Sequence, residues 1–121
     1  MNKVLFNELE NILQKFSEKY NNNEKLQKIL RKWSADILIW SKDESIGFLI
    51  TVNSGKITGI VKVNNPNSGK VKIIGDAVIL IDIFKGMKNP SHLYLDGVIE
   101  VYGSERDQII LDVIVEELWG K

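Results

Sequence analysis

Side chains suited to catalysis are scarce in this chain. There is no cysteine, and the only imidazole is that of His92, which lies in a short segment between Gly86 and Gly97. A Ser-His-Asp triad would have to use this one histidine, and the Gly-x-Ser-x-Gly motif of many hydrolases is absent. No set of His, Asp and Glu has the spacing of metal ligands, and neither phosphate-binding glycine motif occurs. The sequence therefore predicts a non-enzymatic protein with no metal and no cofactor.

The acidic side chains of the apolar segments fall into two groups, of which the first could hold protons and the second could contact a ligand. Asp112, Glu116 and Glu117 fall at i, i+4 and i+5 of an expected helix, on its polar side, which is typical of a solvated face. Asp82 differs because its neighbours in the sequence are all apolar. It is either the single outward position of its helix or an anchor beside the head group of a ligand.

Basic residues gather on one side of the segment 24–33, which contains Lys25, Lys28, Arg31 and Lys32. Such a group either forms a solvated face, holds a CoA phosphate or docks transiently on an anionic membrane surface. We include Lys28 and Lys32 as candidate head-group contacts. Nucleic acid is not an expected partner, because 16 basic and 16 acidic residues leave no net charge.

Two segments are more apolar than a surface helix on a single core requires. Residues 77–85 contain only Asp82 and Lys85 as polar residues, and the apolar residues of 109–119 cover well over half of the helix circumference. A helix that packs on one core needs an apolar stripe over about a third of its circumference. The surplus predicts a second apolar partner, which is another helix, another subunit or a bound apolar ligand.

The elements that position these residues follow from hydrophobic periodicity and turn residues. Helical spacing predicts helices over 3–20, 24–33, 77–85 and 109–119, with a short helical segment opened by Asn89-Pro90. Alternation predicts strands over 35–41, 46–52, 57–63, 71–74 and 98–102, with Asn53-Ser54-Gly55 as a hairpin turn. Asp76 and Gly86 are expected to cap the helix between them, and the first strand is expected to be covered on both faces. The order ααββββααβα predicts an α+β fold with a five-stranded, mixed, largely antiparallel sheet covered by helices.

Glycines and a proline at fixed spacing connect the last elements. The sequence reads Phe84-x-Gly86-x-x-Asn89-Pro90, then Leu93-x-x-x-Gly97-x-Ile99-x-Val101-x-Gly103, and ends in a hydrophobic helix. This pattern resembles the sterol carrier protein (non-specific lipid-transfer, SCP-2-like) family over residues 75–121. The first half agrees with the family only in the order of its elements. The resemblance implies a tunnel, between the sheet and the C-terminal helices, that holds a sterol, a fatty acid or an acyl-CoA.

If the resemblance holds, the surplus apolar residues are candidates for the tunnel wall. Each of them could equally be part of an ordinary hydrophobic core. They are Ile79, Ile83, Phe84, Met87, Leu93, Leu95, Ile110, Val113, Ile114 and Trp119. The resulting hypothesis is a carrier of a fatty acyl, acyl-CoA, sterol or isoprenoid-like lipid. The C-terminal helix would act as a movable lid, with Trp119 near the mouth.

Two other functions stay open on the sequence alone. One is a protein–protein interaction module of the same fold with a closed cavity, which forms a homodimer through the C-terminal helix. The other is an accessory enzyme of acyl-thioester metabolism, for which only Asp82 and His92 are candidate proton-transfer groups.

Length and composition predict one domain over residues 1–121, because 121 residues are enough for a hydrophobic core of their own. No apolar run approaches the ~20 residues of a membrane span. The first residues do not have the pattern of a secretory signal, and the last ones do not match a Ser-Lys-Leu type peroxisomal address. A cytoplasmic location is the expectation.

Overall fold

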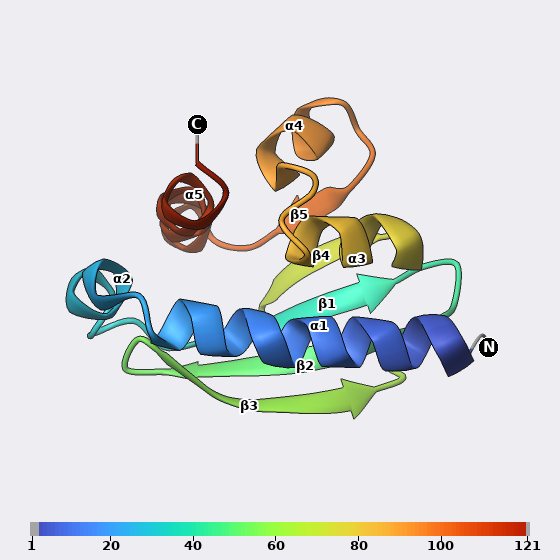
Figure 1. Ribbon diagram of the computed structural model, residues 1–121, viewed down its shortest axis with the longest axis horizontal. Coiled ribbons are helices and arrows are strands. Elements are labelled where there is room, and N and C mark those ends of the chain that lie inside the picture. Colours follow the sequence, from blue (N-terminus) through green and yellow to red (C-terminus); the bar gives the residue numbers. More distant parts are fainter. Residues whose placement is uncertain (1–2, 121) are drawn as a thin grey trace.

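The computed structural model describes residues 3–120, and its elements follow the predicted order (Figure 1). The helices are α1 (Lys3–Asn21), α2 (Glu24–Ile29), α3 (Ala77–Phe84), α4 (Pro90–Leu95) and α5 (Glu105–Trp119). The strands are β1 (Ala35–Ser41), β2 (Ile46–Asn53), β3 (Lys56–Val63), β4 (Val71–Gly75) and β5 (Glu100–Tyr102). The order ααββββααβα is confirmed.

The sheet is mixed and largely antiparallel, as predicted. Its strands lie in the order β3-β2-β1-β4-β5. Only β1 and β4 are parallel among these neighbouring pairs. The hairpin between β2 and β3 turns at Ser54 and Gly55, which both have positive φ, as the favoured two-residue hairpin turn requires. The chain then returns from the β3 edge through the loop 64–70 to place β4 beside β1.

The helices cover one face of the sheet, and the loop 64–70 covers part of the other. Ile37 and Ile39 of β1 are buried on the helix side, and Leu38 is buried on the opposite side. Gly69 lies over that opposite side, where a Cβ on this glycine would lie 3.3 Å from the Leu38 Cβ. The expected covering of the first strand on both faces is thus confirmed, with a loop as the second cover.

Local sequence signals explain most of the element boundaries. The side chains of Asn23, Asn89 and Ser104 accept hydrogen bonds from backbone N–H groups in the first turns of α2, α4 and α5. Gly86 ends α3 with φ +84, and the Met87 N–H donates back to the Asp82 carbonyl. This is the left-handed helix end for which glycine is favoured, so its expected role is confirmed.

The largest boundary differences from the sequence prediction lie in α2, α5 and β5, and one expected capping bond is absent. The helix α2 ends at Ile29 rather than at residue 33, and the Trp33 carbonyl beyond it accepts a hydrogen bond from the Gly55 N–H of the hairpin turn. The helix α5 begins at Glu105 rather than at residue 109. The Asp76 side chain makes no capping hydrogen bond, and the Ala77 N–H donates instead to Asp43 Oδ1 at 2.9 Å. The strand β5 begins at Glu100 rather than at residue 98.

Candidate ligand-binding cavity

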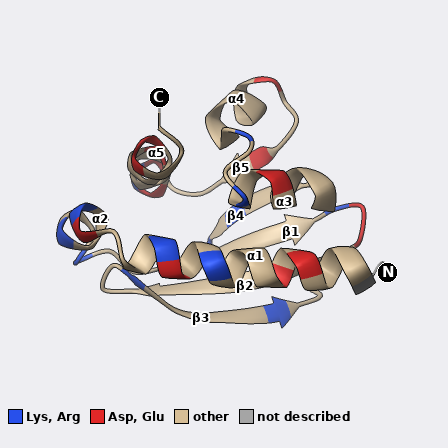
Figure 2. Cartoon of the chain, in the orientation of Figure 1, with Lys and Arg blue, Asp and Glu red and all other residues tan. Residues whose placement is uncertain are grey.

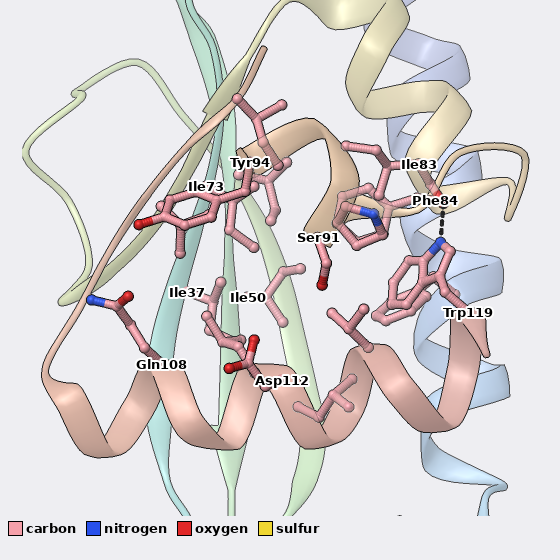
Figure 3. A pocket seen from close by; sticks show the side chains of 18 of the residues that line it. Ile37, Ile50, Ile73, Ile83, Phe84, Ser91, Tyr94, Gln108, Asp112 and Trp119 are labelled. Atoms are coloured by element: carbon pink, nitrogen blue, oxygen red, sulfur yellow. Dashed lines mark hydrogen bonds between the residues drawn. The ribbon is translucent and has the colours of Figure 1, made fainter. Parts of the chain in front are cut away.

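A cavity of about 310 Å³ lies between the sheet and the helices α1, α3, α4 and α5 (Figure 3). Its floor is apolar and comes from the helix-facing residues of the strands. The floor residues include Ile37, Ile39, Ile50, Val52, Ile73 and Val101. These positions share one face because side chains two residues apart in a strand point to the same side of the sheet. The sheet therefore supplies a continuous hydrocarbon surface.

One end of the cavity is formed by three aromatic rings from three helices. Phe16 of α1 lies 5.0 Å from Phe84 of α3 and 5.5 Å from Trp119 of α5, centroid to centroid. The Trp119 Nε1 donates a hydrogen bond to the Ile83 carbonyl at 2.7 Å. Trp119 is therefore held against α1 and α3 by both ring contacts and a hydrogen bond.

Two further aromatic residues in the wall also have partners for their polar atoms. The Tyr20 hydroxyl donates to the Gly55 carbonyl at 2.7 Å, and burial raises the pKa of Tyr20 to about 12. The Trp33 Nε1 donates to Asp107 Oδ1 at 3.0 Å. Because these polar atoms already bond to the protein, the rings present their apolar surfaces to the cavity.

The helix α5 is attached mainly near its two ends. At its start, Asp107 accepts the hydrogen bond from Trp33. Near its end, Glu117 accepts a hydrogen bond from Asn23 at 3.0 Å and forms an ion pair with Lys25 at 3.3 Å. Ile114 is the buried residue of this helix, at 7% exposure, and Ile110, Leu111, Leu118 and Trp119 pack against the core while only partly buried. α5 therefore spans the cavity as a cover with little direct packing on the sheet.

The polar side of the cavity lies between α4 and α5. Ser91 from α4 and Asp112 from α5 lie on facing sides of it (Figure 3). An adjoining polar depression shares Ser91, Asp112 and Val115 with the cavity. Its other lining residues are Asn89, His92, Glu116 and Gly120. We call Ser91, Asp112 and Glu116 the rim.

Five of the ten residues expected in the tunnel wall line the cavity: Ile83, Phe84, Leu95, Ile114 and Trp119. The other five do not: Ile79, Met87, Leu93, Ile110 and Val113. Met87 is 70% exposed and Val113 is 37% exposed, because they lie on outward sides of their segments. Ile110 packs against the hydrophobic core.

The expected head-group contacts lie away from the cavity. Asp82 lies 3.9 Å from Lys88 and is not a lining residue. Lys28 and Lys32 are exposed and are also absent from the lining. Figure 2 shows the basic residues of α2 at one end of the molecule, separate from α4. None of the three residues expected to contact a head group therefore lines this cavity.

Sequence reasoning missed two parts of the site. The first is the sheet floor with Phe16 and Tyr20 of α1, for which the alternation of the strands and the apolar stripe of the helix were available signals. The second is the polar side chains Ser91, Gln108 and Asp112. Asp112 was expected on a solvated face, and it is exposed, but it also borders the cavity.

Within residues 3–120, no group of three or more His, Cys, Asp or Glu residues could hold a metal ion. No helix in the same range is long and apolar enough to cross a membrane.

No protein-family model and no curated protein matches this sequence. Solved structures do match. The crystal structure of sterol carrier protein 2 superposes with a TM-score of 0.67 and 12% identity, over 91% of this chain and 94% of the other. Palmitated SCP2L2 from Aedes aegypti superposes with a TM-score of 0.61 and 12% identity, over 86% of this chain and 90% of the other.

A sec-alkyl sulfatase also matches, with a TM-score of 0.57 and 11% identity. It covers 76% of this chain, but this chain spans only 14% of the sulfatase. The same arrangement thus occurs both as a separate small protein and as a small part of an enzyme. Together with the sheet order and the helix-covered cavity, these likenesses show that the chain has the sterol carrier protein 2 fold.

Proposed function

We propose that this protein is a non-enzymatic carrier that binds one hydrophobic ligand in the cavity beneath α5. The observation that carries the proposal is the cavity itself, whose floor and aromatic end are apolar. Its volume of about 310 Å³ is at the low end of the range of ligand pockets. That size suits a single chain or a compact ring system from the fatty acyl, sterol or isoprenoid-like classes.

Binding in such a cavity needs no reacting group. Transfer of a hydrocarbon chain from water contributes ~0.8 kcal/mol per CH₂, so shape and apolarity supply the affinity. The fold is consistent with this function, since one structural neighbour is a sterol carrier protein and another is described as palmitated. The likeness to a sulfatase covers only a small part of that enzyme, and we assign no reaction to this chain.

The proposal includes a role for α5 as a movable cover. The helix buries one residue, Ile114, and polar contacts of Asp107 and Glu117 hold its ends. Such contacts exchange readily with water, whereas a densely packed helix separates only at a high cost in buried apolar area. Ligand entry would therefore require separation of α5 from α4 and the sheet, without unfolding of β1, β2 or β3.

Native mass spectrometry of the purified protein, before and after organic extraction, tests this function. We expect a discrete adduct of lipid mass that is lost on extraction and regained when a single-chain lipid such as decanol is added. A protein that shows its bare mass throughout, and takes up no added lipid, would contradict the proposal.

A homodimer through α5 is the second candidate, because α5 exposes apolar side chains. Ile109 is 58% exposed and Val113 is 37% exposed on this helix. A dimer mass that persists on dilution and is lost in Ile109→Lys would favour this function. Transient contact with a membrane surface is compatible with either candidate, and vesicle co-sedimentation measures it.

A further inference from the structure

The position of the ligand head group follows from the polar atoms in the wall that have no partner in the protein. Tyr20, Trp33 and Trp119 already donate to protein acceptors, and Gln108 Nε2 donates to the Gly103 carbonyl at 2.9 Å. Among the described residues, none forms a hydrogen bond with the Ser91 hydroxyl or the Asp112 carboxylate. A ligand whose chain lies on the sheet floor would therefore place its polar end at the rim.

The rim and the polar depression beside it carry negative charge. Asp112 and Glu116 lie one turn apart on α5 and border the same depression. No Lys or Arg is among the described residues that line either the cavity or the depression. His92 is the one lining residue of the depression that can become cationic. An anion at the rim would thus lie beside two carboxylates without a lysine or arginine to offset them.

Two lysines outside the lining have acidic partners, and a third, Lys19, donates from its Nζ to the Leu118 carbonyl near the end of α5 at 3.4 Å. Lys25 pairs with Glu117 at 3.3 Å, and Lys88 lies 3.9 Å from Asp82. Figure 2 shows acidic residues on α5, whereas basic residues are spread over several other elements, including α2, α1 and β3. Within residues 3–120, the linings of the cavity and the depression therefore provide no cationic clamp for a carboxylate or a phosphate.

The helix ends that border the depression do not favour an anion either. Gly120 follows the last turn of α5, whose carbonyls form the negative end of the helix dipole, and one of them, that of Leu118, accepts a hydrogen bond from Lys19 Nζ at 3.4 Å. The start of α4 offers few donors, because Pro90 has no N–H and the Ser91 N–H donates to Asn89 Oδ1 at 2.8 Å. Backbone groups on both sides therefore leave an anion poorly accommodated.

We propose that the rim selects ligands whose head group donates a hydrogen bond and carries no negative charge, of which an alcohol is the simplest. Asp112 accepts the hydrogen bond of the hydroxyl, and Ser91 is the second hydrogen-bonding partner. Fatty-acid carboxylates and acyl-CoA phosphates are disfavoured. This inference rests on the proposed carrier function and narrows its ligand class.

The test uses three ligands with the same ten-carbon chain: decanol, decanoate and decylamine. Trp33 and Trp119 line the cavity, so intrinsic fluorescence near neutral pH reports binding of each ligand. We expect decanol and decylamine to bind at least about tenfold more tightly than decanoate, as expected for uncompensated like charge at the rim.

The double variant Asp112→Asn, Glu116→Gln separates head-group charge from chain hydrophobicity. It should improve decanoate binding and weaken decylamine binding, so that the decylamine-to-decanoate affinity ratio falls by about tenfold or more. Glu105→Gln, in the first turn of the same helix and outside both linings, is the matched control and should leave the ratio unchanged.

Two results would overturn the inference. One is decanoate binding as tight as decanol binding in the unsubstituted protein. The other is an unchanged decylamine-to-decanoate ratio in the double variant. If none of the three ligands binds, the carrier function itself fails, which is distinguishable from a failure of head-group selection alone.

Discussion

Helices α1 and α5 both lie on the helix-covered face of the sheet, but they meet it differently. α1 buries Leu9, Leu13 and Tyr20 almost completely, whereas α5 has one buried residue, Ile114, which is 7% exposed. α1 also stacks Phe6 on the Phe48 ring of β2, with ring centroids 5.0 Å apart. The contrast shows that one half of the helix layer builds the core, while the other half covers a space.

The largest expected effect is on the free energy of unfolding, which should depend more on side chains of α1 than on side chains of α5. Leu13→Ala removes a fully buried side chain of α1 and should lower the free energy of unfolding by about 3 kcal/mol. Leu111→Ala, on the cavity side of α5, should lower the free energy of unfolding by only about 1 kcal/mol, because the Leu111 side chain already borders the cavity and has fewer packing contacts to lose. Urea unfolding measures both values, and equal losses would remove the proposed difference between the helices.

A pH dependence of stability is expected from Tyr20 on α1. Burial raises the pKa of Tyr20 to about 12 from its ordinary value of 10.0, so the folded state favours the neutral phenol. This contribution is fully present below pH 10, and it is lost as the pH rises from 10 through 12, by at most about 3 kcal/mol in total. Unfolding measured from pH 8 upward should show the loss in the unsubstituted protein. Tyr20→Phe, the matched control, should lack this component, and an identical pH profile in both would contradict the assignment.

A smaller effect is expected at the aromatic end of α5. Trp119→Phe keeps a ring beside Phe16 and Phe84 but removes the hydrogen bond from Trp119 Nε1 to the Ile83 carbonyl. The cost should be about 1 kcal/mol, with faster amide hydrogen exchange in α5 and unchanged exchange in α1. Faster exchange in both helices would show that α5 does not open on its own.

The smallest effect is expected at the ion pair between Lys25 and Glu117. Lys25 is mostly exposed, and its Nζ lies 3.3 Å from Glu117 Oε1. Lys25→Ala should change the free energy of unfolding by less than about 0.5 kcal/mol, and added salt should reduce even that difference. A loss above about 1 kcal/mol would mean that polar contacts hold α5 more firmly than the account assumes.

The sequence predicted the fold better than it predicted the site. Turn residues define the elements, as at Ser54 and Gly55, where positive φ allows the tight hairpin. Caps such as Asn89 and Ser104 define the starts of the last helices. These signals are local, so they are readable without any knowledge of tertiary packing.

The site depends on which side of an apolar helix faces the cavity, and local patterns do not contain that information. In α3, Ile79 and Ile83 are both apolar, yet only Ile83 lines the cavity. In α5, the side with Gln108, Leu111, Asp112 and Val115 faces the cavity, so an acidic residue borders an apolar space. The position of Asp112 at the edge of the cavity was not predictable, because the sequence suggested only a solvated polar face.

Filling the cavity with a larger side chain shows whether the ligand binds there. Leu111→Trp places a larger side chain in the cavity wall, whereas Ile109→Trp places the same side chain on an exposed position of the same helix. Calorimetric titration with decanol should show one bound ligand per chain for the unsubstituted protein and for Ile109→Trp. The Leu111→Trp variant should fold but bind decanol at least about tenfold more weakly than the unsubstituted protein does. Equal binding by both variants would place the ligand outside this cavity and contradict the account.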